Sequence, residues 1–389
     1  MKQIYLDNSA TTPLCAPAID AMRQAIEHYG NPSSLHPLGQ AAHTVLEHAR
    51  RDVAATLGLR RPPEPGQLIF TSCGSEADNL AILGTAYAKS RRRGGRVITT
   101  DSEHPGVENA MRALEKDGFE VIRIPTRGGV LDMERLNDAL NSSVFLVSLM
   151  AVNNETGAAY DLETAFSLVK AYNDTIVTHT DAVQGYLKRP LNTTSLKADM
   201  ITVSAHKIQG PKGVGALYVS PAALKRRDLS PVLFGGGQES GFRSGTENLI
   251  GIAGFAAAAK CGFEHMQRDI AHMRALRALA IEQLSALPVQ LNIPHGSCAP
   301  HILNLTLPDI RSETMLHALS AHRICVSAGS ACSSHSKSIS AALTAFGLSP
   351  AQIECSIRVS FGPQNTEDDV TALTHALSAE IERLVKIHR

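Results

Sequence analysis

The sequence predicts an α/β protein whose core is a mostly parallel β-sheet with helices on both faces. Three observations support this prediction. Short apolar segments alternate with helical segments along about two thirds of the 389 residues, as in sheets built with crossover helices. Polar residues follow several of these segments directly, where such sheets bind their ligands. After about residue 260 the segments become shorter, which indicates a second, smaller α+β domain.

The composition argues against several functional classes. Lys+Arg and Asp+Glu number 37 each, so no charge bias points to direct nucleic-acid or membrane-surface binding. No apolar run has the length of a membrane span, and the first residues lack a signal-peptide core, so we expect a cytoplasmic protein. The 7 cysteines include no Cys-x-x-Cys pair, and the 16 histidines show no ligand spacing. Free thiols and no bound metal are therefore expected.

The first strand, expected at 67–71, runs into a turn of small residues and then an apolar helix. Strand, turn and helix in this order form an anion site, because unpaired N–H groups at the helix start point outward. Gly74 and Ser75 stand where a phosphate would bind. The alternative is a serine that only caps the helix.

Strands and helices then alternate. Further strands are expected at 97–100, 119–124, 144–150, 175–179, 200–203 and 214–219, and helices at 16–29, 39–56, 80–88, 106–115 and 162–172. The polar side chains just past strand ends are His104, Asn154, Asp181, Gln184, Ser204, His206 and Lys207. Since the carboxyl ends of parallel strands share one edge of the sheet, we expect these residues to line one pocket.

Lys207 follows a strand and precedes a turn rich in glycine and proline. A lysine held there is placed to point into a cleft, where desolvation would free its amine to form a Schiff base. The alternative is a solvated loop lysine, because lysines are mostly exposed.

A glycine-dense loop at 234–248 precedes an Ala-rich helix at 249–260. The loop matches neither a Walker motif nor a dinucleotide fingerprint, so it suits a backbone that closely approaches another surface. A separate long helix is expected at about 263–287, and shorter elements at 302–307, 313–321, 324–327, 355–361 and 367–387. We place a large domain at 14–260 and a small domain at 1–13 and 261–389.

Two residues of the small domain could carry chemistry. Cys332 lies in a serine-rich segment at 328–340 with almost no apolar anchor, so we expect a mobile, exposed loop. Its thiol is either incidental or a nucleophile. Arg358 lies on an alternating strand, and its planar fork would suit a substrate carboxylate. A surface salt bridge is the alternative.

Ten stretches, in this order, resemble the cysteine desulfurases, which belong to the class V aminotransferase-like group of pyridoxal-phosphate enzymes. They lie at 5–13, 30–36, 70–79, 103–104, 153–157, 180–184, 204–207, 243–248, 329–332 and 357–361. The resemblance spans essentially the whole chain and implies the type I fold of aspartate aminotransferase, with pyridoxal 5'-phosphate as cofactor. One departure is Cys73, in a Cys-Gly-Ser sequence where relatives often have Gly-Gly-Thr or Gly-Ala-Thr.

The resemblance also implies residue roles. Lys207 would bind the cofactor aldehyde, His104 would stack on the ring, and Asp181 would pair with the ring nitrogen. The residues implied at the ring oxygen or substrate are Gln184 and Asn154, those at the phosphate are Gly74, Ser75, Ser204, His206 and, from the second subunit of a homodimer, Thr246, and that at the substrate carboxylate is Arg358.

Cys332 would be the nucleophile that takes sulfur from L-cysteine, leaving alanine and a persulfide. Its loop resembles those of desulfurases that serve an iron–sulfur scaffold or a tRNA thiolation enzyme, where this thiol can also be a transient iron–sulfur ligand. Two alternatives are a selenocysteine lyase or related aminotransferase, and a binding partner that has lost its chemistry. Cys332 and its expected mobile loop argue against the first alternative, and the presence of Lys207, His104, Asp181 and Cys332 together argues against the second.

Overall fold

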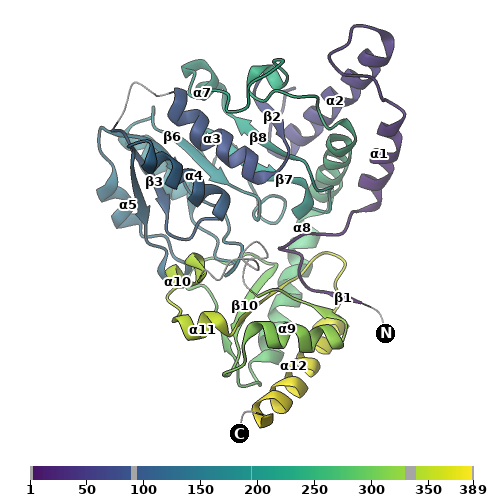
Figure 1. Ribbon diagram of the computed structural model, residues 1–389, viewed down its shortest axis with the longest axis vertical. Coiled ribbons are helices and arrows are strands. Elements are labelled where there is room, and N and C mark those ends of the chain that lie inside the picture. The colour runs from purple at the N-terminus through teal and green to yellow at the C-terminus, as the bar shows by residue number, and fades with distance from the viewer. Residues whose placement is uncertain (1–2, 89–93, 194, 329–338, 388–389) are drawn as a thin grey trace.

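The computed structural model describes residues 3–88, 94–193, 195–328 and 339–387. Figure 1 shows a large sheet enclosed by helices, with a smaller group of strands and helices beside it that contains both chain ends. Among the described residues, no helix combines the length and the apolar character needed to cross a membrane. Cys332 lies outside the described residues.

The large sheet has seven strands in the order β2-β8-β7-β6-β5-β3-β4. They are β2 (Leu68–Thr71), β3 (Arg96–Thr100), β4 (Glu120–Ile124), β5 (Val144–Ser148), β6 (Val177–Asp181), β7 (Met200–Ser204) and β8 (Gly215–Val219). Only β8, which is antiparallel to both its neighbours, departs from the parallel arrangement of this sheet. The predicted mostly parallel sheet is confirmed.

Helices cover both faces of this sheet because its strands are apolar on both sides. The helices of this part are α1 (Ala16–Ile26), α2 (Pro37–Thr56), α3 (Gly74–Ala88), α4 (Pro105–Lys116), α5 (Met133–Ala139), α6 (Leu162–Tyr172), α7 (Pro221–Arg226) and α8 (Leu249–Leu284). Successive strand residues pack on opposite faces. Ile98 packs in the core that includes α2, α6 and α8, whereas Val97 packs in the core that includes α3 and α4.

The smaller group has its own core, which contains Leu6 and residues between Met273 and Leu384. Its elements are β1 (Ile4–Tyr5), β9 (Gln290–Leu291), β10 (Ile302–Thr306), α9 (Ser312–Ala321), β11 (Ile324–Cys325), α10 (Ala341–Phe346), α11 (Pro350–Glu354), β12 (Ser356–Ser360) and α12 (Glu367–Ile387). Strand β1 pairs in parallel with β11, so the N-terminal segment lies in this group. The domain limits given above stay a prediction.

Several expected element limits differ from those of the structure, and three differences matter for the site or the domain organisation. Residues 249–284 form one continuous helix instead of two, because Gly262 stays helical and packs against Leu187. Helix α3 begins at Gly74, inside the segment expected to be a turn. Strand β6 ends at Asp181, two residues later than expected. Helices α5, α7, α10 and α11 were not expected.

Candidate active site

A cavity of about 170 Å³ opens at the carboxyl ends of β5, β6 and β7. Ten of the predicted site residues line it: Gly74, Ser75, His104, Asn154, Asp181, Gln184, Ser204, His206, Lys207 and Arg358. The structure thus brings together residues from 74 to 358 of the sequence. Thr246 is exposed on its loop and does not line this cavity.

Lys207 ends the short 3₁₀-helix η3 (Ala205–Lys207), which follows β7 directly. Its Nζ lines the cavity and donates hydrogen bonds to the carbonyls of Ser9 (2.6 Å) and Ala10 (2.8 Å). The N-terminal segment therefore holds the amine in place. A solvated loop lysine does not describe this residue, which is half-buried and anchored twice.

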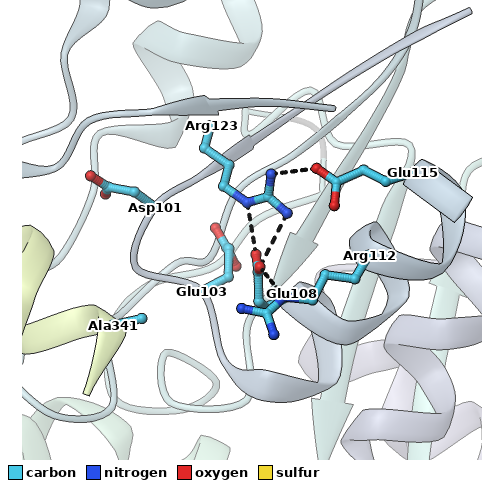
Figure 2. A pocket seen from close by; sticks show the side chains of 7 residues that line it. All are labelled: Asp101, Glu103, Glu108, Arg112, Glu115, Arg123 and Ala341. Atoms are coloured by element: carbon cyan, nitrogen blue, oxygen red, sulfur yellow. Dashed lines mark hydrogen bonds and ion pairs between the residues drawn. The ribbon is translucent and has the colours of Figure 1, made fainter. Parts of the chain in front are cut away.

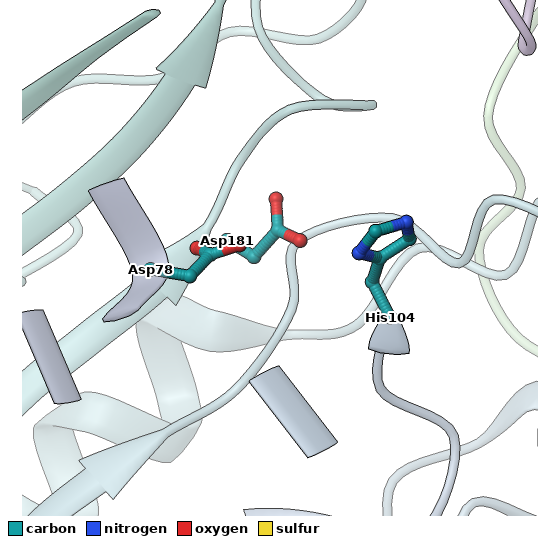
Figure 3. Close-up of side chains that lie close together, drawn as sticks. All are labelled: Asp78, His104 and Asp181. Atoms are coloured by element: carbon teal, nitrogen blue, oxygen red, sulfur yellow. The ribbon is translucent and has the colours of Figure 1, made fainter. Parts of the chain in front are cut away.

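Asp181 is the last residue of β6, and its carboxylate lies between Asp78 and His104 in Figure 3. Ligand-type atoms of these three side chains lie within 4.8 Å of one another. Burial raises the pKa of Asp181, and His104 and Lys207 oppose that rise. Burial and the charge of Asp181 raise the pKa of Asp78 well above its usual value.

The His104 ring is fixed by its position at the start of α4. The side chain caps this helix, since Nδ1 accepts a hydrogen bond from the N–H of Gly106 at 3.1 Å. Burial lowers the pKa of His104. A neutral ring with Nδ1 engaged keeps a defined orientation beside Asp181.

The other end of the cavity is suited to an anion. Helix α3 begins here at Gly74, where a Cβ would lie only 2.8 Å from Cγ2 of Val183. The hydroxyl of Ser204 is buried and has no hydrogen-bond partner among the described residues. A helix N-terminus with a close glycine and an available hydroxyl is a phosphate-binding arrangement.

Arg358, on β12, is buried, so the surface salt bridge considered for it is wrong. One guanidinium nitrogen, Nη1, donates to the carbonyl of Asn154 at 2.8 Å, and Nη2 lies 2.9 Å from Oδ1 of Asp7. Its Nε is buried without a partner in the described part of the chain. Gln184 donates to the carbonyl of Ser9 and lies 3.3 Å from Nε2 of His301.

Sequence reasoning missed several contributors to this site. Asp78 lies within α3, in the stretch 70–79 that the family resemblance includes, but no role was expected for it. Ser9 and Ala10 fall in a stretch that the family resemblance includes, but their carbonyl contacts with Lys207 depend on the fold. His301 precedes β10 and reaches Gln184 only through tertiary packing.

A second, larger cavity of about 420 Å³ contains none of the predicted site residues. It is lined by Asp101, Glu103, Glu108, Arg112, Glu115, Arg123 and Ala341. Figure 2 shows that its arginines are already paired: Arg123 with Glu108 and Glu115, and Arg112 with Glu108. This cavity is therefore lined mainly by side chains that form ion pairs with one another on α4 and β4.

The residues of the first cavity fit pyridoxal phosphate. A buried carboxylate at one end suits a protonated ring nitrogen, and the anion site at the other end suits a phosphate. The amine of Lys207 lines the same space and would reach the aldehyde. The orphaned hydroxyl of Ser204 and the glycine close to Val183 are the observations that carry this fit.

Comparisons with known proteins point to the same chemistry. The family profile Aminotransferase class-V matches residues 4–373. Cysteine desulfurase IscS from Dictyoglomus turgidum is 36% identical over 387 residues, which cover 98% of this chain and 95% of the relative. A cysteine desulfurase from Trichormus azollae is 38% identical over 389 residues, covering 99% and 94%.

Solved structures are similar over nearly their full length. A NifS-like protein gives a TM-score of 0.89 at 34% identity, covering 99% of this chain and 100% of the other. SspA in complex with cysteine gives a TM-score of 0.77 at 30% identity, covering 94% and 100%.

Proposed function

This chain belongs to the class-V aminotransferase family, and we propose that it acts there as a pyridoxal-phosphate-dependent cysteine desulfurase. It converts L-cysteine to L-alanine and keeps the sulfur as a persulfide on Cys332. The observation that carries this proposal is the cavity in which Lys207, Asp181 and an anion site converge. The relatives named above as cysteine desulfurases support the substrate, as does the complex of SspA with cysteine.

When bound, pyridoxal phosphate supplies an aldehyde for amines and a protonated ring that accepts electron density. The chain would hold it by residues at three places. Asp181 would keep the ring nitrogen protonated, His104 would cover the ring, and the start of α3 with Ser204 would hold the phosphate. The carbonyls of Ser9 and Ala10 orient Lys207 toward the aldehyde.

Arg358 would bind the substrate carboxylate and so fix the substrate sulfur at one place. Its guanidinium is already oriented by Asn154 and Asp7, and its free Nε leaves one donor for a ligand. The thiolate of Cys332 would then bond to that sulfur as the carbon–sulfur bond breaks. The electron pair stays with the substrate carbon, which takes up a proton to give alanine.

The test is Cys332→Ser, with the parent as reference. The parent should bind pyridoxal phosphate, release alanine from L-cysteine and gain one sulfur on the peptide that contains Cys332, as mass spectrometry would measure. The serine variant should still show a spectral change with cysteine but release neither alanine nor sulfide, because the nucleophile is missing. Alanine release at the parent's rate would favour the lyase alternative instead.

We also propose a homodimer in which Thr246 reaches the phosphate of the partner subunit. The exposure of Thr246, away from its own cavity, supports this proposal. Mixing inactive Thr246→Ala and Lys207→Ala variants should restore activity, because half of the hybrid sites combine the two intact residues. A fully active monomer in sedimentation would contradict it. The sulfur acceptor would be a scaffold for iron–sulfur clusters or a tRNA thiolation enzyme, which persulfide transfer to each candidate would distinguish.

A further inference from the structure

A second lysine, Lys188, lines a cavity together with the half-buried Lys207. Lys188 is only 7% exposed, and its Nζ has no hydrogen-bond partner among the described residues. A buried amine without a partner is costly, so its presence calls for a reason. Lys188 follows Asp181 and Gln184 in the turn after β6.

The backbone next to Lys188 is strained. Leu187 has a φ of +57°, in the left-handed region that side chains other than glycine, asparagine and aspartate seldom adopt. Such strain persists only where the surroundings enforce it, and it is concentrated at functional sites. Here the strain at Leu187 lies in the turn that directs the side chain of Lys188 into the protein interior.

Lys188 and Lys207 share one small cavity. Both line a space of about 40 Å³, on the side of Lys207 that faces α8, together with Asp269 and Thr12. Asp269 is already paired with Arg268 at 2.9 Å. The two lysines therefore border the same small space, and they are near enough for the charge of Lys207 to act on Lys188.

We propose that Lys188 is a positioning residue for the proposed reaction: its buried amine, beside a cavity that both lysines line, disfavours the protonated state of Lys207. This inference rests on the proposed function of Lys207. Like charges on two neighbouring amines repel, so protonation of one disfavours protonation of the other.

The pKa shifts of Lys188 and of the histidines near it are consistent with this repulsion. Burial, followed by the charge of Lys207, lowers the pKa of Lys188 to about 7. The charge of Lys188 also reaches His206 and His301, and burial is the main cause that lowers the pKa of both. Burial lowers the pKa of His206 to about 3 and that of His301 well below its usual value, so both rings are neutral at pH 7 and neither offsets the repulsion. The positive charge of Arg358, like that of Lys188, also lowers the pKa of His301.

The experiment is a pH titration of the visible band that pyridoxal phosphate gives when bound to Lys207. Lys188→Met keeps most of the aliphatic side chain and removes the amine, so the midpoint should rise by up to about one pH unit, the value for a fully charged neighbour. A charge within about 12 Å produces such a shift at an effective dielectric constant of about 20. Lys188→Arg, which keeps a permanent charge, should hold the midpoint at or below the parent value.

The matched control is Lys212→Met, the same change at an exposed lysine five positions from Lys207. Solvent and salt screen that charge, so the midpoint should stay within about 0.2 pH unit. An unchanged midpoint in Lys188→Met, with the band intact, would overturn the positioning role and leave the proposed function standing. Absence of any band in the parent would instead refute the cofactor.

A second measurement needs no variant. Acetylation of the parent at a series of pH values, mapped by mass spectrometry, should give Lys188 a half-point near pH 7, clearly below that of the exposed Lys212. Coincident profiles for the two lysines would overturn the proposal even if Lys188→Met does not fold.

Discussion

Glu239→Gln should destabilise the protein strongly, because it removes the charge partner of a buried arginine. Glu239 lies in the glycine-dense loop, with its side chain 1% exposed, and Arg50 lies on α2 with its side chain 12% exposed. Two hydrogen bonds join them, at 2.6 and 3.0 Å. The same carboxylate accepts the N–H of Phe70 in β2 at 2.8 Å.

The expected loss of stability in Glu239→Gln depends on how well the remaining charge of Arg50 is compensated. Removing one partner of a buried ion pair costs about 3–5 kcal/mol, because the other charge stays buried. Glu47 also lies 3.0 Å from Arg50 and is 36% exposed, so it offsets part of this loss. We therefore expect a loss of about 3 kcal/mol in the free energy of unfolding, at the lower end of that range.

Urea unfolding followed by circular dichroism would measure this loss. The matched control is Glu47→Gln, which removes a carboxylate from the same arginine at an exposed position and should cost less than about 1 kcal/mol. If the two variants lose equal stability, the buried pair does not anchor the loop. Because that loop also carries Thr246, Glu239→Gln should weaken cofactor binding as well.

Two further predictions concern buried carboxyl groups. Asp181→Asn should still bind the cofactor but lose on the order of a hundredfold or more in alanine release, because a neutral amide no longer favours a protonated ring nitrogen; turnover within a few-fold of the parent would argue against the role. Burial raises the pKa of Glu103 to about 8, above its unfolded value. Stability tied to this group is therefore fully present below about pH 4.5 and lost as the pH rises through 8. Glu103→Gln should flatten the fall in unfolding free energy between pH 5 and 8.5, and parallel curves for parent and variant would contradict this.

The sequence predicted the fold well wherever local signals and tertiary packing agree. Helix α6 has the predicted limits because Asp161 caps its start and its apolar face is periodic. Helix α8 was divided because Gly262 breaks the pattern locally, whereas contact with Leu187 favours continuation. The start of α3 was placed too late, since its small residues look like a turn and their helical state depends on packing.

The same distinction applies to the site. Residues at strand ends were predictable, because the edge of a parallel sheet gathers them. Asp78, Lys188 and His301 were not, because nothing in their local sequence shows that they face the cavity or the space behind it. The roles of these residues depend on their burial, which follows from the tertiary structure and not from the local sequence.

Helix α8 also has a mechanical consequence. Its 36 residues span about 54 Å, and its two ends lie in different cores, with Phe255 in one and Leu276 in the other. Within this fully described helix no residue from 260 to 269 is buried. The helix thus connects the two cores. If the smaller group rotated by about 5° around the other end of α8, the far end of the helix would move by roughly 5 Å, about the length of one helical turn. Residues 260–269 contact the larger core through Gly262 and Met266 without being buried, so this is the segment of α8 that would bend if Arg358 moved relative to Lys207.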